Sequence, residues 1–198
     1  MVDSEVLQIY GAHSTTDIDN AIRRSEIELP HHELKQGLLR LRDGRDVEPD
    51  VVPKVIRTIC AIANNGKERA GQILIGVTDK EVDAARVRDL DKIEPRKVGS
   101  RFVVGVKREA TARGEKPEDY FARWKQGIRL SELSQPQRGS VLSNMDYHDY
   151  FGLGLIVITV PPQRGLSTVG EDAYWREGDE TKKAIGASKV GELALRFT

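Results

Sequence analysis

Acidic side chains at three places in this 198-residue chain are spaced so that they could act together. Glu28 and Glu33 flank a short segment that contains Pro30, Lys35 follows two residues later, and Asp79 comes just after a brief apolar run. Residues five apart share no face of a helix or strand, so the glutamates converge only if the chain bends, as Pro30 favours. A carboxylate just past a buried strand is aimed by a rigid element and left accessible by its loop.

Three converging carboxylates would suit a divalent cation, because Mg²⁺ and Mn²⁺ prefer oxygen ligands. Such an ion orients an attacking oxygen and stabilises charge on a scissile phosphate, and Lys35 would add a positive charge there. The spacing alone also fits acids that serve as ion-pair partners or helix caps, because acidic residues are abundant on protein surfaces.

Other familiar chemical motifs are missing from the sequence. The four histidines show no metal-ligand spacing, and no segment matches the phosphate loop G-x-x-x-x-G-K-[ST]. The single cysteine, Cys60, excludes an intrachain disulfide framework and a cysteine-based zinc site. It falls within an apolar helical stripe, which predicts packing rather than nucleophilic work. Four aromatic residues could stack on bases, although their predicted positions favour core packing: Tyr120, Trp124, Tyr174 and Trp175.

The elements that must position these residues are a mixture of helices and strands. Ser14 and Asp17 form a capping-box pattern that predicts a helix over 15–25. Apolar residues three and four apart predict a helix that Asp50 and Pro53 open and Asn64 closes. Further helices are predicted over 117–134 and 188–197. Apolar and β-branched runs predict strands, within 29–40 and over 72–77, 101–106, 153–160 and 173–176. No regular βαβ rhythm emerges, so we expect an α+β fold, a mixed or antiparallel sheet flanked by helices.

Charge is balanced over the whole chain but not along it. The 31 basic and 31 acidic residues cancel, yet residues 1–34 hold seven acids against two bases. Residues 86–129 hold thirteen bases against seven acids, which permits a basic face, although a solvated mixed-charge surface is the simpler interpretation. No apolar run approaches the roughly 20 residues of a membrane helix, and the N-terminus lacks a signal-peptide pattern. We therefore expect a cytoplasmic protein with no membrane partner.

The order of several motifs resembles the AlbA-like domain of the Schlafen family. The pattern Glu28-x4-Glu33-Leu-Lys is followed by Ile-Cys-Ala-Ile-Ala-Asn at 59–64 and by Gly-Gln-Ile-Leu-Ile-Gly-Val-Thr-Asp at 71–79. Later segments agree, with Leu-Ile-Val-Ile-Thr-Val-Pro at 155–161 and Tyr-Trp-Arg-Glu-Gly-Asp-Glu-Thr at 174–181. Residues 1–27 are then an N-terminal helical extension and 28–198 the Schlafen AlbA-like domain, which in bacteria is often attached to others. The sequence departs from the family in having Ile62 in place of its phenylalanine, and a longer basic loop over 66–71.

This resemblance implies a domain that binds nucleic acid. Several Schlafen members are metal-dependent endoribonucleases that cut tRNA and rRNA, and bacterial members are linked to transcriptional regulation or anti-phage defence. Here Glu28, Glu33 and Asp79 would hold Mg²⁺ or Mn²⁺, and Lys35 would stabilise charge on the phosphate. Basic residues of the positively charged segment are then candidates for contacts with the nucleic-acid backbone: Arg96, Lys97, Arg101, Lys107 and Arg108.

Two other classes of function stay open at this stage. In the first, the chain is a non-catalytic nucleic-acid-binding module that regulates a larger protein, and its acids are structural. In the second, it is a nucleotide sensor or a protein adaptor, which the zero net charge would suit. The resemblance favours RNA over DNA as partner, with tRNA foremost, and leaves open a homo-oligomer or an attached effector or sensor domain.

Overall fold

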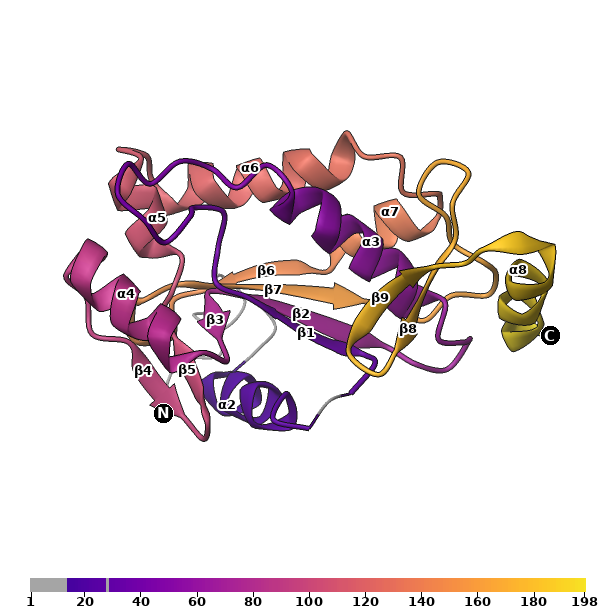
Figure 1. Cartoon of the computed structure of the whole chain (residues 1–198), viewed down its shortest axis with the longest axis horizontal. Coiled ribbons are helices and arrows are strands. Elements are labelled where there is room, and N and C mark those ends of the chain that lie inside the picture. The colour runs from indigo at the N-terminus through magenta and orange to yellow at the C-terminus, as the bar shows by residue number, and fades with distance from the viewer. Residues whose placement is uncertain (1–13, 28) are drawn as a thin grey trace.

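The computed structural model describes residues 14–27 and 29–198, and its centre is a four-stranded mixed sheet (Figure 1). The strand order is β1-β2-β7-β6, with β1 parallel to β2 and the other neighbours antiparallel. The bounds of these strands are His32–Lys35 for β1, Gly71–Ile75 for β2, Leu155–Val160 for β7 and Met145–His148 for β6. Together with the helices that flank the sheet, this confirms the expected α+β fold.

A smaller sheet continues directly from the end of β2. Gly76 has a φ of +105°, and there the chain leaves the central sheet to form β3 (Val77–Thr78). A Cβ atom at this glycine would lie 2.7 Å from Leu155 Cδ2. Both the positive φ and this close contact therefore exclude a larger residue. The strand order is β3-β5-β4, where β4 is Arg96–Val98 and β5 is Arg101–Val103. A separate hairpin near the C-terminal end pairs β8 (Tyr174–Glu177) with β9 (Glu180–Lys183).

Helices cover both faces of the central sheet, because its strands alternate apolar residues between two core clusters. The face that carries Ile73 and Ile158 packs against α3, α6 and α7. These helices have the bounds Val51–Ala63, Pro117–Arg129 and Gln137–Ser143. The opposite face, which carries Leu74 and Val157, packs against α2 (Thr15–Arg24). The helix expected as an N-terminal extension therefore belongs to the core of the described fold.

The remaining helices lie between successive strands or follow the β8–β9 hairpin. They are α4 (Glu81–Asp91), α5 (Lys107–Ala112), α8 (Gly186–Ala194), η1 (Tyr150–Gly152) and η2 (Leu195–Phe197). None of the helices in residues 14–27 and 29–198 is long and apolar enough to cross a bilayer.

Several expected elements are confirmed and others end early. The Ser14–Asp17 capping box is present at the start of α2, and α3 ends at Ala63, next to the expected Asn64. The strand expected over 101–106 stops at Val103, and the one over 72–77 is broken at Gly76. The sequence patterns did not predict β4, β6, β9, α4, α5 or α7.

Candidate functional site

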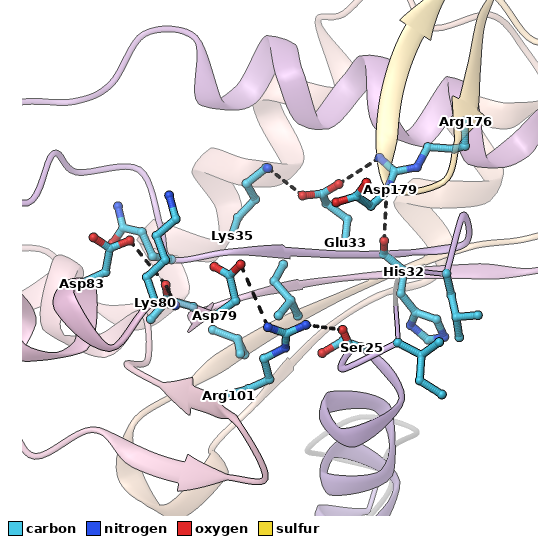
Figure 2. Close-up of a pocket in the computed structure, with 16 residues that line it drawn as sticks. Ser25, His32, Glu33, Lys35, Asp79, Lys80, Asp83, Arg101, Arg176 and Asp179 are labelled. Atoms are coloured by element: carbon cyan, nitrogen blue, oxygen red, sulfur yellow. Dashed lines mark hydrogen bonds and ion pairs between the residues drawn. The ribbon is translucent and has the colours of Figure 1, made fainter.

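A cavity of about 400 Å³ opens at the end of β1, where the two sheets and the β8–β9 hairpin meet (Figure 2). Its lining combines acidic and basic side chains in equal number. The acids are Glu33, Asp79, Asp83 and Asp179, and the bases are Lys35, Lys80, Arg101 and Arg176. Among the residues that the structure describes, the charged lining is therefore neutral overall, yet dense in groups that bind cations and phosphates.

The topology brings Glu33 and Asp79 to this one cavity from distant parts of the sequence. β1 runs parallel to β2, with Glu33 beside Ile73 and Lys35 beside Ile75. The turn at Gly76 then sends the chain past the end of β1 into β3, and Asp79 follows directly. Both acids predicted from the sequence thus line the same cavity, together with Lys35. The third predicted carboxylate, Glu28, lies outside the described residues.

Glu33 is held between two cations. Its Oε1 accepts a hydrogen bond from Lys35 Nζ at 2.7 Å, and its Oε2 accepts one from Arg176 Nη1 at 2.9 Å. The Arg176 side chain is only 1% exposed, and it also donates to Thr181 Oγ1 and to the carbonyl of His32. Arg176 therefore ties the β8–β9 hairpin to β1 and fixes the orientation of the Glu33 carboxylate (Figure 2).

Asp79 has a more open environment. The residue's side chain is 56% exposed, and its nearest cation is Arg101 Nη1, 4.0 Å from Oδ2. Arg101 is itself anchored, because it donates a hydrogen bond to the carbonyl of Ser25 at the end of α2. The Thr78 hydroxyl donates a hydrogen bond to Oδ2 of the nearby Asp83 at 3.4 Å. Asp79 is therefore less committed than Glu33 to protein partners that would compete with a ligand.

The donor atoms suit a divalent cation in type, although the described residues alone do not complete a site. Carboxylate oxygens are the ligands that Mg²⁺ and Mn²⁺ prefer, and Glu33 and Asp79 supply them. Within residues 14–27 and 29–198, no three His, Cys, Asp or Glu side chains are grouped closely enough to hold a metal ion. The third carboxylate predicted from the sequence, Glu28, lies outside these residues, while Asp83 and Asp179 also line the cavity.

His32 lines the cavity and has an unusual ionisation. Burial, the neighbouring His31 and the positive charge of Arg24 lower the pKa of His32 to about 4. The imidazole is therefore neutral near pH 7.

A pH-dependent loss of stability follows from that low pKa. Between the ordinary value of 6.5 and about 4, the unfolded chain binds a proton at His32 that the folded protein does not. The free energy of unfolding should therefore fall as the pH is lowered through this window. Urea unfolding from pH 8 to pH 4 would measure the slope. His32→Gln should flatten it below pH 6.5 and leave it unchanged near pH 8, and an equal slope in both proteins would contradict the assignment.

The basic residues predicted to contact nucleic acid lie in different parts of the structure. Arg101 lines the cavity, and Lys107 is half-exposed at the start of α5. Arg96 and Lys97 extend from β4 and lie over aromatic rings, Arg96 over Phe151 and Lys97 over Phe102. These residues do not gather in one patch around the cavity.

The expectation for Arg108 is wrong, because its side chain is fully buried. It forms ion pairs with Asp91 and Glu109, and it donates to the carbonyl and side chain of Gln36. A cation held in this way cannot reach a nucleic-acid backbone without unfolding the surrounding structure. Its charge compensates buried carboxylates instead.

Comparison with known proteins adds little to this geometry. No family model matches the sequence, and no curated protein matches it. Among solved structures, the DIP2311 protein from Corynebacterium diphtheriae is similar at 15% identity with a TM-score of 0.45. The alignment covers 78% of this chain and 25% of that one, so this chain spans about a quarter of that protein's length. A likeness at this level supports no functional argument, and the Schlafen resemblance stays a prediction.

Proposed function

We propose that this protein is a metal-dependent endoribonuclease whose active site is the cavity at the end of β1. The observation that carries the proposal is the meeting of Glu33 and Asp79 with Lys35, Arg101 and Arg176 in one cavity. Carboxylates that can bind a metal, next to cations that can bind a phosphate, are what phosphodiester cleavage requires.

The roles of the side chains follow from their surroundings. Glu33, Asp79 and Glu28 would hold Mg²⁺ or Mn²⁺, which supplies positive charge against the phosphate when bound. Lys35 and Arg101 contact the non-bridging phosphate oxygens, while Arg176 keeps Glu33 oriented. The attacking oxygen of water or of a 2′-hydroxyl gives up its proton to solvent and forms a bond to phosphorus as the bond to the leaving ribose oxygen breaks. The leaving oxygen takes up a proton.

The neutral charge balance of the cavity also supports a requirement for metal. Among the described lining residues four acids offset four bases, and Glu28 would add a further acid, so the lining by itself offers a polyanion no net attraction. A divalent cation would turn this balance positive and favour the binding of a phosphate. RNA, with tRNA foremost, is the proposed substrate on the basis of the family resemblance.

A cleavage assay tests this function directly. Wild-type protein and the Glu33→Gln variant would be incubated with tRNA, rRNA and single-stranded DNA in Mn²⁺, Mg²⁺ or EDTA. We expect discrete RNA fragments from the wild type that need metal and disappear in the variant. Metal-independent fragments, or equal cutting by both proteins, would contradict the proposal.

One observation favours a second candidate, a non-catalytic nucleic-acid-binding module. Both oxygens of Glu33 are occupied by Lys35 and Arg176, as in a structural ion-pair network. If that arrangement persists, Glu33 serves to join β1 to the β8–β9 hairpin. RNA binding that is equal in Mg²⁺ and EDTA, with no fragments under any condition, would favour this candidate.

A further inference from the structure

Phe151 is an exposed aromatic residue at the tip of the loop that joins β6 to β7. Phe151 is 57% exposed. The preceding Tyr150 is buried, and its hydroxyl donates a hydrogen bond to Asp19. Phe151 adopts a left-handed conformation, with φ of 48° and ψ of 36°, which L residues rarely take. The anchored Tyr150 and this local backbone together hold a large apolar ring out in solvent.

One cation lies directly over the exposed ring, and a second lies near the same loop. The Arg96 guanidinium lies 3.7 Å from the centroid of Phe151, and the Tyr150 ring meets Phe151 edge-on at 4.8 Å. Lys107 contacts the same loop: its ammonium is 3.9 Å from Asp149, and its backbone amide donates to the carbonyl of Leu153. An exposed aromatic ring with cations beside it matches the chemistry of a base attached to a phosphate.

A second cavity, of about 410 Å³, adjoins this loop. Gly152, Leu153 and Lys107 line it, opposite the apolar side chains of Leu90 and Ile93. It shares no lining residue with the cavity at the end of β1. The loop therefore offers a flat ring on its tip and a partly apolar recess behind it.

We propose that Phe151, Arg96 and Lys107 form a stacking site for an unpaired nucleotide of the RNA. The base stacks on the exposed side of the Phe151 ring, and its phosphate binds to Arg96 and Lys107. The apolar recess accommodates the adjoining sugar or base. The inference rests on the proposed function for its ligand, but it uses none of the residues assigned to catalysis.

The β4–β5 hairpin connects this stacking site to the cavity at the end of β1. Arg96 and Val98 share one face of β4, and Val98 is paired with Arg101 across the hairpin. One end of the hairpin thus supplies Arg101 to the cavity, and the other supplies Arg96 to Phe151. The two sites are fixed relative to one another by a single short element.

A matched set of variants tests the stacking site. Phe151→Asn removes the ring but keeps a residue that tolerates the left-handed conformation, and Phe151→Trp keeps an aromatic ring. Leu130→Ala is the control, because Leu130 is 74% exposed and lines neither cavity. Fluorescence anisotropy would measure the binding of a short labelled oligouridine and of duplex RNA, with Ca²⁺ in place of Mg²⁺ to keep the strands uncut.

We expect Phe151→Asn to weaken binding of the single strand by between about 5-fold and 100-fold, the usual range for one lost base stack. Phe151→Trp and Leu130→Ala should bind within about twofold of the wild type, since stacking tolerates any aromatic ring. Duplex RNA should lose less affinity, because its bases are already paired.

Two outcomes would overturn the inference in different ways. Unchanged single-strand affinity in Phe151→Asn refutes the stacking site alone, because metal-dependent cleavage by the wild type would still support the proposed function. An equal loss for single-strand and duplex RNA would refute base stacking and leave Phe151 as a general surface contact. Absence of cleavage in the separate assay, with normal single-strand binding that depends on Phe151, would instead refute the nuclease and keep the stacking site.

Discussion

Asp79→Asn is expected to lower the rate of metal-dependent RNA cleavage by about 100-fold to 1000-fold, the usual effect of removing one charged group that stabilises the transition state. The substitution replaces a negative oxygen ligand with a weaker neutral one and changes little else. Because Asp79 is largely exposed and contacts Arg101 only at 4.0 Å, the fold should not depend on its charge. Initial rates in Mn²⁺ and thermal unfolding by circular dichroism would measure the two effects separately.

Asp83→Asn is the matched control for that experiment. Asp83 lines the same cavity four residues later, in the first turn of α4, and the two acids could exchange places in an alignment with the Schlafen pattern. We expect Asp83→Asn to keep most of the wild-type cleavage rate. A loss confined to Asp83→Asn would move the metal ligand to that residue, and unchanged rates in both variants would exclude a metal site on this loop.

Glu109→Gln should lower the free energy of unfolding by about 3–5 kcal/mol, the usual cost of breaking a buried charged network by removing one partner. The Glu109 carboxylate is fully buried, and it accepts hydrogen bonds from the backbone amides of Leu38 and Leu39. It also accepts from the Tyr120 hydroxyl at 2.6 Å and from Arg108 at 3.0 Å. A glutamine cannot satisfy this set, since one of its two terminal groups only donates.

Gly37 shows how closely the chain folds around that carboxylate. A Cβ atom at this position would lie 2.1 Å from Glu109 Oε1. The loop that follows β1 is thereby pinned to α5, next to Gln36 and Lys35 of the candidate active site. Glu109→Gln should therefore disturb the end of β1 as well as global stability.

Glu94→Gln provides the surface comparison for the buried network. Glu94 pairs with Arg88 through two hydrogen bonds, but both side chains are mostly exposed. Exposed pairs of this kind contribute little to stability, so urea unfolding should show little change. A Glu109→Gln variant as stable as Glu94→Gln would mean that the buried network contributes far less than its geometry suggests.

The sequence was enough to predict helices and strands whose stabilising contacts involve neighbouring residues or an almost entirely apolar segment. The Ser14–Asp17 capping box satisfies free amides within one helical turn, so the start of α2 depends on neighbouring residues alone. The apolar stripe of α3 and the β-branched run of β7 are strong sequence signals, because both elements are buried on most sides. These positions could not be exposed without a large cost.

The missed elements have weak local signals and are stabilised by distant partners. α4 buries only Ala84 and Val87, so its sequence reads as a charged surface segment. β6 carries Asp146 and His148 and becomes a strand because it pairs with β7. Propensity gives little guidance where tertiary pairing decides the structure.

The candidate site was predictable only in part for the same reason. Glu33 and Asp79 could be singled out because each lies at a strand, but Arg176 joins them from a hairpin near the other end of the chain. Arg108 was misplaced because nothing near it in the sequence reveals its buried partner Asp91. Phe151 gave no periodic signal, since its exposure depends on the anchoring of Tyr150.

The ion pair between Arg176 and Glu33 also determines how early in translation the complete cavity can form. The walls of the cavity extend in sequence from Ser25 to Asp179, so nearly the whole described chain must be synthesised before they can close. A nascent chain on the ribosome holds Glu33 and Asp79 early, but it has no guanidinium to orient the glutamate until Arg176 emerges. The cavity is therefore incomplete for most of the time that the chain is being synthesised on the ribosome.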